Sequence, residues 1–274
     1  MAVRDAISSS SPLLLLGCGK MGGALLEGWL ADGLSADALY TVDPSGAPTG
    51  AKADHHAPSL TDLNCPMPRV VVVATKPQIL ADVLPALKPF VGEGTVVLSI
   101  AAGATVQSFR DVVGQDVAVI RAMPNTPAAI GKGMTVMVGD DLLAHDMQLA
   151  EALMASSGLV RWVEDEALMD AVTGVSGSGP AYVFHMVEAM AKAGVAQGLD
   201  ADLAMTLARQ TIIGAAALLD QSDESAATLR ENVTSPNGTT AAGLSVLMAD
   251  DGLIDLMTRT IAAATKRGKE LGEG

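Results

Sequence analysis

The chain has 274 residues, which is enough for two small domains or one large one. Hydrophobic residues make up 49% of it and charged residues 18%, so a sizeable core can form and disorder of the whole chain is not expected. The net charge of −14 argues against nucleic acid as a partner, because neutralising phosphates requires clustered Lys and Arg. The two cysteines, Cys18 and Cys65, do not make a disulfide scaffold and suit a reducing compartment.

The N-terminal segment shows no convincing export signal or membrane span. Its apolar run covers only residues 13–16 and is followed at once by glycines and Lys20. A secretory signal needs a longer apolar region, and a transmembrane helix needs about 20 mostly apolar residues. We therefore expect residues 1–12 to be a disordered tail and the protein to be cytoplasmic, with no membrane partner.

Short apolar runs alternate with helical patterns through the first half of the chain. Helices are predicted at 21–30 and 79–87, between runs that end in glycine, proline or polar residues. This alternation implies βαβ crossovers and a mostly parallel sheet, so the fold class is α/β. Strands are predicted at residues 13–16, 39–42, 70–75, 95–100, 117–122, 134–138 and 159–163.

The second half changes character near residue 165, so we expect a sheet domain at 13–165 and an all-helical domain at 166–274. The helix at 181–196 is apolar almost all round, because its strongly polar side chains His185, Glu188 and Lys192 fall on one narrow stripe. A small helical domain cannot easily surround such a helix, and we expect a second subunit to cover it. Helices are predicted at residues 179–197, 201–220, 239–250 and 253–271.

A glycine-rich loop links the first predicted strand to the first long helix. Its sequence fits G-x-G-x-x-G in the strand–loop–helix context that dinucleotide binding requires, so a Rossmann-like domain is predicted. The glycines let the backbone approach a pyrophosphate, and the helix N-terminus supplies N–H donors. The six residues of the loop are Gly17, Cys18, Gly19, Lys20, Met21 and Gly22.

The second strand ends at Asp43, 26 residues beyond Gly17. A carboxylate there accepts hydrogen bonds from the ribose of NADH and repels a 2′-phosphate, which favours NADH over NADPH. Ser45 could instead donate to a phosphate. The segment Asp-Pro-Ser-Gly at 43–46 could also be a β-turn with no role in binding.

Three further loops follow predicted strands at the edge of the sheet where ligands of open α/β folds bind. They cover residues 74–78, 99–103 and 121–127, and they combine small residues with prolines. Small residues allow a flat ring to approach closely, and prolines fix the shape of a loop.

Two polar, glycine-bearing segments lie in the second half, at residues 170–182 and 229–244. In the later segment, Ser, Asn, Gly and Thr residues precede a helical pattern. A helix N-terminus with such donors is suited to a carboxylate, although it could also be a cap that binds nothing.

Taken with GCGKMG, ATKPQ, SIAAG and RAMPNTP, the two segments DAVTGVSGSGPAY and LRENVTSPNGTTAAGL resemble Δ1-pyrroline-5-carboxylate reductases along essentially the whole chain. Two positions depart from that family's pattern. Thr75 stands where Val is usual in A-V-K-P, and Asn237 stands where the first Gly of S-P-G-G is usual.

The resemblance implies a Rossmann-like domain followed by a helical dimerisation domain, and reduction of the cyclic imine of pyrroline-5-carboxylate to L-proline by NADPH or NADH. It implies a homodimer or higher homo-oligomer, a small-molecule substrate and no metal. Substrate contacts are expected from Glu166, Ser235, Gly238, Thr239 and Thr240, with the Thr240 hydroxyl near the imine nitrogen as the catalytic group. Cofactor contacts beyond the glycine loop are expected from Asp43, Ser45, Ala74, Thr75, Lys76, Pro77, Ala102 and Asn232.

Two other classes of protein remain open at this point. A β-hydroxyacid dehydrogenase shares the glycine loop and the overall plan, but it needs a catalytic lysine shortly after a Gly-x-Gly, and residues 180–185 contain none. A non-catalytic dinucleotide-binding regulator would not need the polar segments of the second half. The absence of a Cys/His/carboxylate spacing typical of metal sites favours hydride chemistry without a metal.

Overall fold

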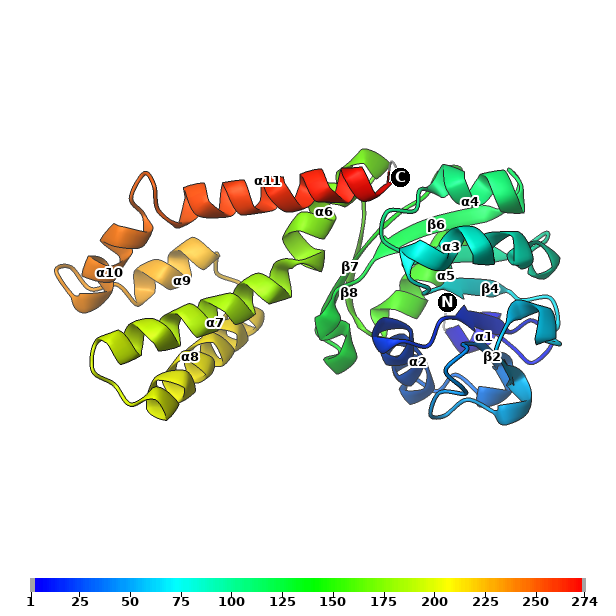
Figure 1. The fold of residues 1–274 in the computed structure, drawn as a ribbon, viewed down its shortest axis with the longest axis horizontal. Helices are drawn as coiled ribbons and strands as arrows, with labels where there is room; N and C mark the ends of the chain where they lie inside the picture. The colour runs from blue at the N-terminus through cyan, green and yellow to red at the C-terminus, as the bar shows by residue number, and fades with distance from the viewer. Residues whose placement is uncertain (1–2, 273–274) are drawn as a thin grey trace. The chain divides into compact units, whose positions relative to one another are not determined.

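The computed structural model describes residues 3–272 and divides into two compact units. The first unit runs to Gly177 and takes in the chain again from Ala264 onward, and the second is Ser178–Ala263. The helix α11 (Leu253–Gly272) therefore begins in the second unit and ends in the first. The ribbon in Figure 1 follows both units from the N-terminus to the C-terminus.

The first unit is built on one eight-stranded sheet, part of which is labelled in Figure 1. Its strand order is β3-β2-β1-β4-β5-β6-β7-β8. Neighbouring strands are parallel except β6 and β7, so the expected mostly parallel sheet is confirmed. The strands are β1 Leu13–Leu16, β2 Leu39–Val42, β3 His56–Ala57, β4 Val70–Val73, β5 Val96–Ser99, β6 Ala118–Met123, β7 Gly133–Val138 and β8 Gly158–Trp162.

The side chains of the central strands alternate between two buried layers. Leu13 and Leu15 pack with α2 (Lys20–Ala31) and α5 (Ala144–Ala155), whereas Leu14 and Leu16 pack with the helices on the opposite face. That face is covered by α3 (Pro77–Val83) and α4 (Val106–Val113). Strands buried on both faces explain the continuous apolar runs in the sequence, because neither set of side chains meets water.

The expected disordered tail differs from the structure over the described residues 3–12. A short helix α1 occupies Val3–Ala6, and Ile7 is buried in the core layer that holds α2 and α5. Burial of an apolar side chain offsets the entropy lost by ordering the segment. Residues 1 and 2 of the expected tail lie outside the described residues.

The division between the units also lies further along the chain than residue 165. Helix α6 (Met169–Val172) belongs to the first unit, because Met169 is fully buried against Val136 and Val138 of β7. A π-helix at Thr173–Gly177 follows α6 and ends where the second unit begins.

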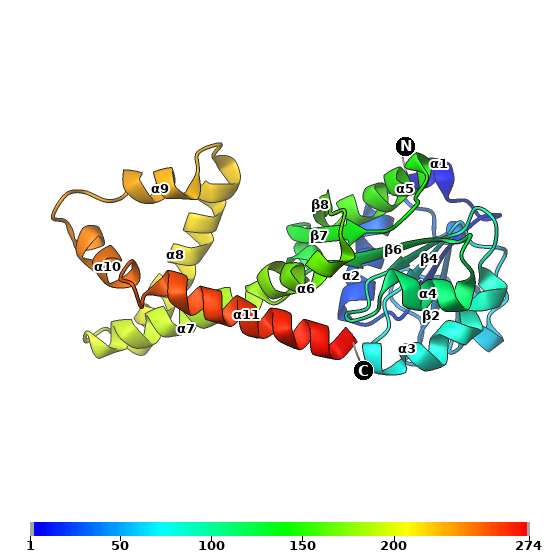
Figure 2. The ribbon, with the colours of Figure 1, turned by 90° about the horizontal axis from the view of Figure 1, so that it is seen from above.

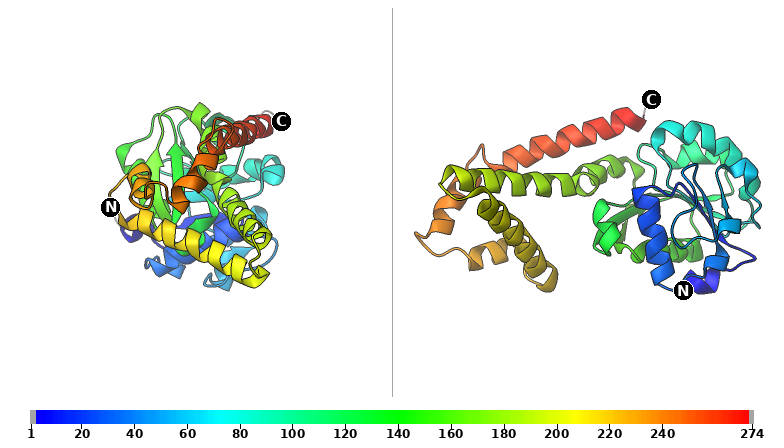
Figure 3. Two further views of the ribbon diagram at one scale, coloured as in Figure 1. Left: turned by 90° about the vertical axis from the view of Figure 1, so that its left-hand side faces the viewer. Right: turned by 60° about the horizontal axis from the view of Figure 1, so that its bottom comes forward.

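The second unit is entirely helical and almost without a core of its own. Its buried residues are only Ala191, Ala204 and Ala208, on α7 and α8. These two helices pack against each other near the turn that joins them and diverge from there (Figures 2 and 3). Large apolar side chains such as Phe184 and Ile213 are exposed. The helices are α7 Gly179–Ala196, α8 Ala201–Gln221, α9 Ala226–Asn232, α10 Thr239–Leu247 and the start of α11.

Helix α8 is long and apolar enough to cross a bilayer by length and composition alone, with 11% of its apolar window buried. It is the single helix of this kind among residues 3–272. Apolar helices that bury their surface in a partner subunit meet the same criterion.

Candidate functional site

The glycine loop is held tightly between the ends of two strands and the start of α2. Gly17 has φ +87°, a left-handed conformation that favours glycine, and its amide donates to the Val42 carbonyl at 2.8 Å. A Cβ on Gly17 would lie 2.7 Å from the Ala74 carbonyl oxygen. A Cβ on Gly22 would overlap the Gly17 carbonyl oxygen, so α2 approaches the loop as closely as glycine alone allows.

A cavity of about 710 Å³ opens beside this loop, at the carboxyl ends of β1, β2 and β4. It brings together seven of the predicted cofactor residues: Gly17, Gly19, Asp43, Ser45, Ala74, Thr75 and Lys76. A Cβ on Gly19 would meet nothing within 4 Å, so this glycine leaves open space on the cavity side of the loop. The residues present fit a dinucleotide, whose pyrophosphate requires close approach to such a loop.

The far wall of the cavity suits the adenosine half of a dinucleotide. Asp43 and Ser45 lie at the turn after β2, where the ribose of a dinucleotide is bound in this fold. A flat base needs apolar walls on its faces. Apolar side chains line the rest of this part, contributed by Val42, Pro44, Pro58, Leu60, Ile79, Val83 and Ala86.

Asp43 joins the glycine loop to the turn after β2. Its Oδ2 accepts from the Cys18 amide at 2.6 Å, and its Oδ1 accepts from the Ser45 amide at 2.8 Å. Partial burial of the carboxyl opposes ionisation. The amide hydrogen bonds from Cys18 and Ser45, together with the Ser45 hydroxyl and the charge of His56, outweigh it and hold the pKa of Asp43 below its usual value. The sequence pointed to Asp43 as a ribose ligand; its hydrogen bonds show that it also fixes the conformation of the loop.

The neighbouring thiol is not a reactive group. Burial, and then the negative charge of Asp43, raise the pKa of Cys18 to about 12. A thiol with such a pKa stays protonated at neutral pH and is a poor nucleophile. Cys18 therefore lies in the loop as a small, neutral side chain.

The other predicted cofactor residues lie outside the set that lines the cavity. Lys20 and Met21 form the first turn of α2, Pro77 is the first residue of α3, and Ala102 lies in the loop after β5. Asn232 ends α9 in the second unit, where its Nδ2 donates to Glu224 at 3.1 Å.

The predicted carboxylate site forms the N-terminus of α10 in the second unit. Asn237 has φ +58°, a left-handed conformation that asparagine tolerates, which explains how it replaces glycine here. The Gly238 amide donates to the Ser235 carbonyl at 3.0 Å, and a Cβ on Gly238 would overlap the Ser235 hydroxyl. No side chain caps this helix within the described chain. Thr239 and Thr240 occupy its first two positions, where amides have no partner inside the helix.

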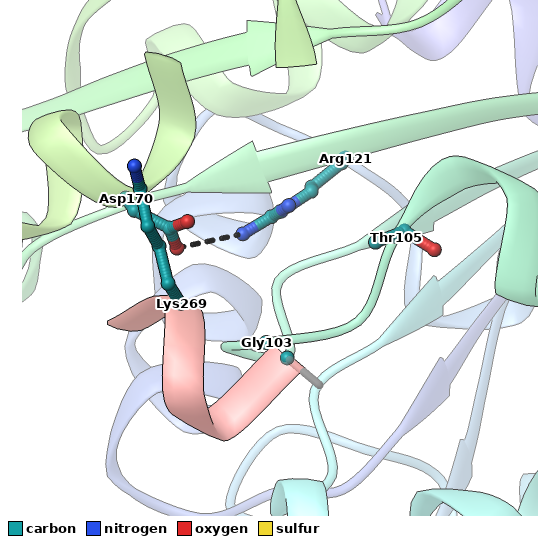
Figure 4. Close-up of a pocket in the computed structure, with 6 residues that line it drawn as sticks. Gly103, Thr105, Arg121, Asp170 and Lys269 are labelled. Carbon is teal, nitrogen blue, oxygen red and sulfur yellow. Dashed lines mark ion pairs between the residues drawn. The ribbon is translucent and has the colours of Figure 1, made fainter. Parts of the chain in front are cut away.

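Glu166 belongs to a different cluster, in the first unit. Its carboxylate accepts from the Val106 amide at the start of α4 at 3.0 Å and pairs with the Arg121 guanidinium at 3.0 Å. Arg121 also faces Asp170 at 3.9 Å, as Figure 4 shows, beside a cavity of about 190 Å³. These contacts fix the position of the Glu166 carboxylate.

Arg121 was not singled out from the sequence, although a signal existed. It is the one charged residue in the apolar run of β6, and a buried guanidinium requires carboxylate partners. Asn125 was also missed: its Nδ2 donates to the Ser176 carbonyl at 3.1 Å and its Oδ1 accepts from the Met134 amide at 2.9 Å. It ties the loop after β6 to the π-helix.

Within residues 3–272, no group of three or more His, Cys, Asp or Glu side chains could hold a metal ion. A mostly parallel sheet, a glycine loop that opens α2 and a cavity with an acidic residue on the ribose side define a dinucleotide-binding protein of the Rossmann type.

Comparisons with known proteins give the family. Residues 166–271 match the family model described as pyrroline-5-carboxylate reductase dimerisation, and residues 13–103 match one described as NADP oxidoreductase, coenzyme F420-dependent. A pyrroline-5-carboxylate reductase from Pisum sativum is 36% identical over 99% of this chain and 100% of its own length. The chain belongs to the pyrroline-5-carboxylate reductase family.

Solved structures agree with that membership. The Coxiella burnetii pyrroline-5-carboxylate reductase is 31% identical, with a TM-score of 0.85 over 96% of this chain and 98% of its own. The Plasmodium falciparum enzyme, solved with NADP bound, is 29% identical, with a TM-score of 0.81 over 96% of this chain and 99% of its own. The start of the dimerisation match at residue 166 coincides with the predicted domain boundary, although the compact units divide at 177.

Proposed function

We propose that this chain reduces the cyclic imine of Δ1-pyrroline-5-carboxylate to L-proline with NADPH or NADH, the last step of proline biosynthesis. The observation that supports this most is the dinucleotide cavity at Gly17, Gly19 and Asp43 in a chain of this family. The alternatives of a β-hydroxyacid dehydrogenase and a non-catalytic regulator lose their support, because full-length relatives at 36% identity are pyrroline-5-carboxylate reductases.

The cofactor would bind along the carboxyl edge of the parallel sheet. The glycine loop from Gly17 to Gly22 would hold the pyrophosphate, and Asp43 with Ser45 would face the adenosine ribose. Ala74, Thr75, Lys76, Pro77 and Ala102, which follow β4 and β5, would meet the rest of the dinucleotide, together with Asn232. When bound, its nicotinamide supplies the hydride.

The substrate has a carboxylate and an imine nitrogen, and the start of α10 offers a partner for each. The Thr239 amide and the Ser235 hydroxyl would hold the carboxylate beside Gly238, whose own amide donates to the Ser235 carbonyl and fixes the turn. Neutral donors of this kind need no Lys or Arg, which suits a chain with a net charge of −14. The hydroxyl of Thr240, one residue on, would hydrogen-bond the ring nitrogen as it gains basicity. Glu166 stays a further substrate contact in this proposal.

The second unit would complete its core in a homodimer. It leaves Phe184, Leu218 and Ile254 more than half exposed, and its buried residues are alanines alone. A helical unit of this size needs a partner to bury its apolar surface. Its match to the family's dimerisation model supports the same conclusion, and an apolar helix α8 inside a subunit interface needs no membrane. We propose that the enzyme is cytoplasmic and has no nucleic-acid partner.

The test is a spectrophotometric assay of the purified protein. Oxidation of NADPH or NADH at 340 nm is expected with pyrroline-5-carboxylate and not with β-hydroxyacid or β-ketoacid controls. An absence of turnover of pyrroline-5-carboxylate with both coenzymes would overturn the proposal.

A further inference from the structure

One buried hydroxyl of the cofactor cavity has no hydrogen-bond partner. Three buried polar side-chain atoms lack a partner among the residues that the structure describes: Oγ1 of Thr75, Nε of Arg110 and Nε1 of Trp162. Of these residues, only Thr75 lines the dinucleotide cavity. A buried hydroxyl without a partner lowers stability, so its retention at a ligand site calls for a ligand that satisfies it.

Thr75 lies directly against the glycine loop. It follows β4, whose neighbour Ala74 donates its amide to the Leu16 carbonyl at 2.7 Å. A Cβ on Gly17 would lie 3.1 Å from the Thr75 amide nitrogen. The Thr75 backbone therefore borders the part of the loop that approaches a pyrophosphate in this fold.

The geometry allows the hydroxyl to turn toward a ligand. In the protein alone it is enclosed, while the residue as a whole lines the cavity. Threonine carries its hydroxyl and its methyl group on the same Cβ, so a rotation of about 120° about Cα–Cβ can move the hydroxyl to the position that the methyl group held. An oxygen acceptor in the cavity would favour the rotamer that directs the hydroxyl at it.

We propose that the Thr75 hydroxyl donates a hydrogen bond to an oxygen of the ribose–pyrophosphate backbone of the dinucleotide, and has no partner until the dinucleotide binds. This inference rests on the proposed function for the identity of the ligand. The Thr75 hydroxyl would then raise the affinity for the dinucleotide and lower the stability of the free protein.

The test compares Thr75→Val, which keeps the shape and removes the hydroxyl, with Thr75→Ser, which keeps the hydroxyl. The dissociation constants of NADH and NADPH are measured by titration calorimetry, and the Tm of the free protein is measured at one protein concentration. Thr75→Val should weaken dinucleotide binding by about 3- to 10-fold and raise the Tm of the free protein by about 2–4 °C. Thr75→Ser should bind within about twofold of the wild type.

Thr95→Val is a matched control at the amino end of β5, whereas the cavity lies at the carboxyl ends of β1, β2 and β4. The Thr95 hydroxyl is buried but satisfied, since it donates to the Pro68 carbonyl at 2.9 Å. Its removal should lower the Tm and leave dinucleotide affinity unchanged. The opposite signs of the two Tm changes separate an unpaired hydroxyl from a paired one.

Titration with ADP identifies the acceptor. A loss of ADP affinity in Thr75→Val places the contact on the pyrophosphate or the adenosine ribose, and a loss confined to the whole dinucleotide places it on the nicotinamide ribose. Equal dinucleotide affinity of Thr75→Val and wild type, a lowered Tm of Thr75→Val, or equal weakening by the Ser and Val variants would overturn the inference. A wild type that binds neither dinucleotide would instead overturn the proposed function.

Discussion

The chemistry proposed for Thr240 depends on one hydroxyl at the second position of α10. Thr240→Ala removes it but keeps the backbone amide, and alanine is favourable in a helix, so the fold should persist. A hydrogen bond that strengthens as the imine nitrogen gains basicity acts in the transition state, so kcat should fall about 10- to 100-fold with a smaller change in KM. Steady-state kinetics measure both constants.

Thr239→Ala is the control for that variant, because it alters the same helical turn and also keeps its amide. It should change kcat by much less. A Thr240→Ala enzyme with normal circular dichroism and near wild-type kcat would move the proton-side role to Glu166 or to a bound water.

Asp43 combines two effects that one substitution can separate. Asp43→Ser removes a negative charge beside the ribose, so kcat/KM for NADPH should improve relative to NADH. It also replaces the carboxylate that accepts from the Cys18 amide by a shorter, neutral hydroxyl, so the absolute kcat/KM should fall for both coenzymes. An unchanged NADPH-to-NADH ratio of kcat/KM would show that Asp43 fixes the loop without discriminating the coenzymes.

The same carboxylate sets an expectation for pH. The pKa of Asp43 is lowered in the folded protein, so its hydrogen bonds to the loop are fully present above the ordinary aspartate pKa of about 3.9. Their contribution is lost only as the pH falls through the still lower folded value. Between pH 5 and 8, the dinucleotide affinity of the wild type should therefore depend on pH in the same way as that of Asp43→Ser. Calorimetric titrations of both proteins across that range test this.

At the scale of elements, α2 shows how a glycine can be required by packing alone. A Cβ on Gly22 would overlap the Gly17 carbonyl oxygen and lie 3.2 Å from the Ala74 side chain. Gly22→Ala must therefore push α2 away from the glycine loop. We expect a fall in Tm of several degrees and a loss of NADH affinity of tenfold or more, measured by thermal denaturation and fluorescence titration.

The adjacent Gly23 supplies the matched control within the same helix. Its Cβ would lie 3.5 Å from the Cys18 carbonyl oxygen, an ordinary contact. Gly23→Ala should stabilise the protein by about 0.5–1 kcal/mol, because alanine loses less backbone entropy in a helix. Equal behaviour of the two variants would contradict the packing argument for Gly22.

The elements themselves could largely be predicted, for physical reasons that differ along the chain. The strand at 39–42 was predicted at its observed bounds, because both faces are buried and its ends are marked by turn residues. The strand at 70–75 was predicted two residues too long: Ala74 and Thr75 are apolar or β-branched, but they leave the ladder to line the cavity. Helix α9 was taken as part of a polar segment, since residues 226–232 have little apolar periodicity.

The site could be predicted where a local pattern encodes it and not where folding joins distant residues. The glycine loop and the start of α10 are contiguous motifs, and both form the local structures expected. The bond from the Cys18 amide to Asp43 spans 25 residues, and the Arg121–Glu166 pair spans 45. Such pairs depend on strand order, which a single sequence does not specify.

For the whole molecule, the imbalance between the two units is the decisive feature. The first unit has two extensive apolar layers, whereas the second buries only alanines. Exposed apolar area of this extent on a helical unit favours association through that unit. The helix at 181–196, predicted to be covered by a partner, has Val183, Phe184 and Val195 exposed in the single chain.

The dimer proposal is tested best on α7, because a narrow polar stripe on this otherwise apolar helix offers a control position. Phe184 is 65% exposed in the single chain and would be buried in the dimer, so Phe184→Glu should place a charge in an apolar interface and dissociate or unfold it. Met190→Glu should act in the same way.

Lys192→Glu is the control: it introduces the same side chain on the polar stripe with His185 and Glu188, and should leave the dimer intact. Sedimentation velocity at micromolar concentration distinguishes the species. A stable wild-type monomer would overturn the dimer proposal. A dimer that survives Phe184→Glu unchanged would mean that α7 faces solvent and that another surface of the second unit forms the interface.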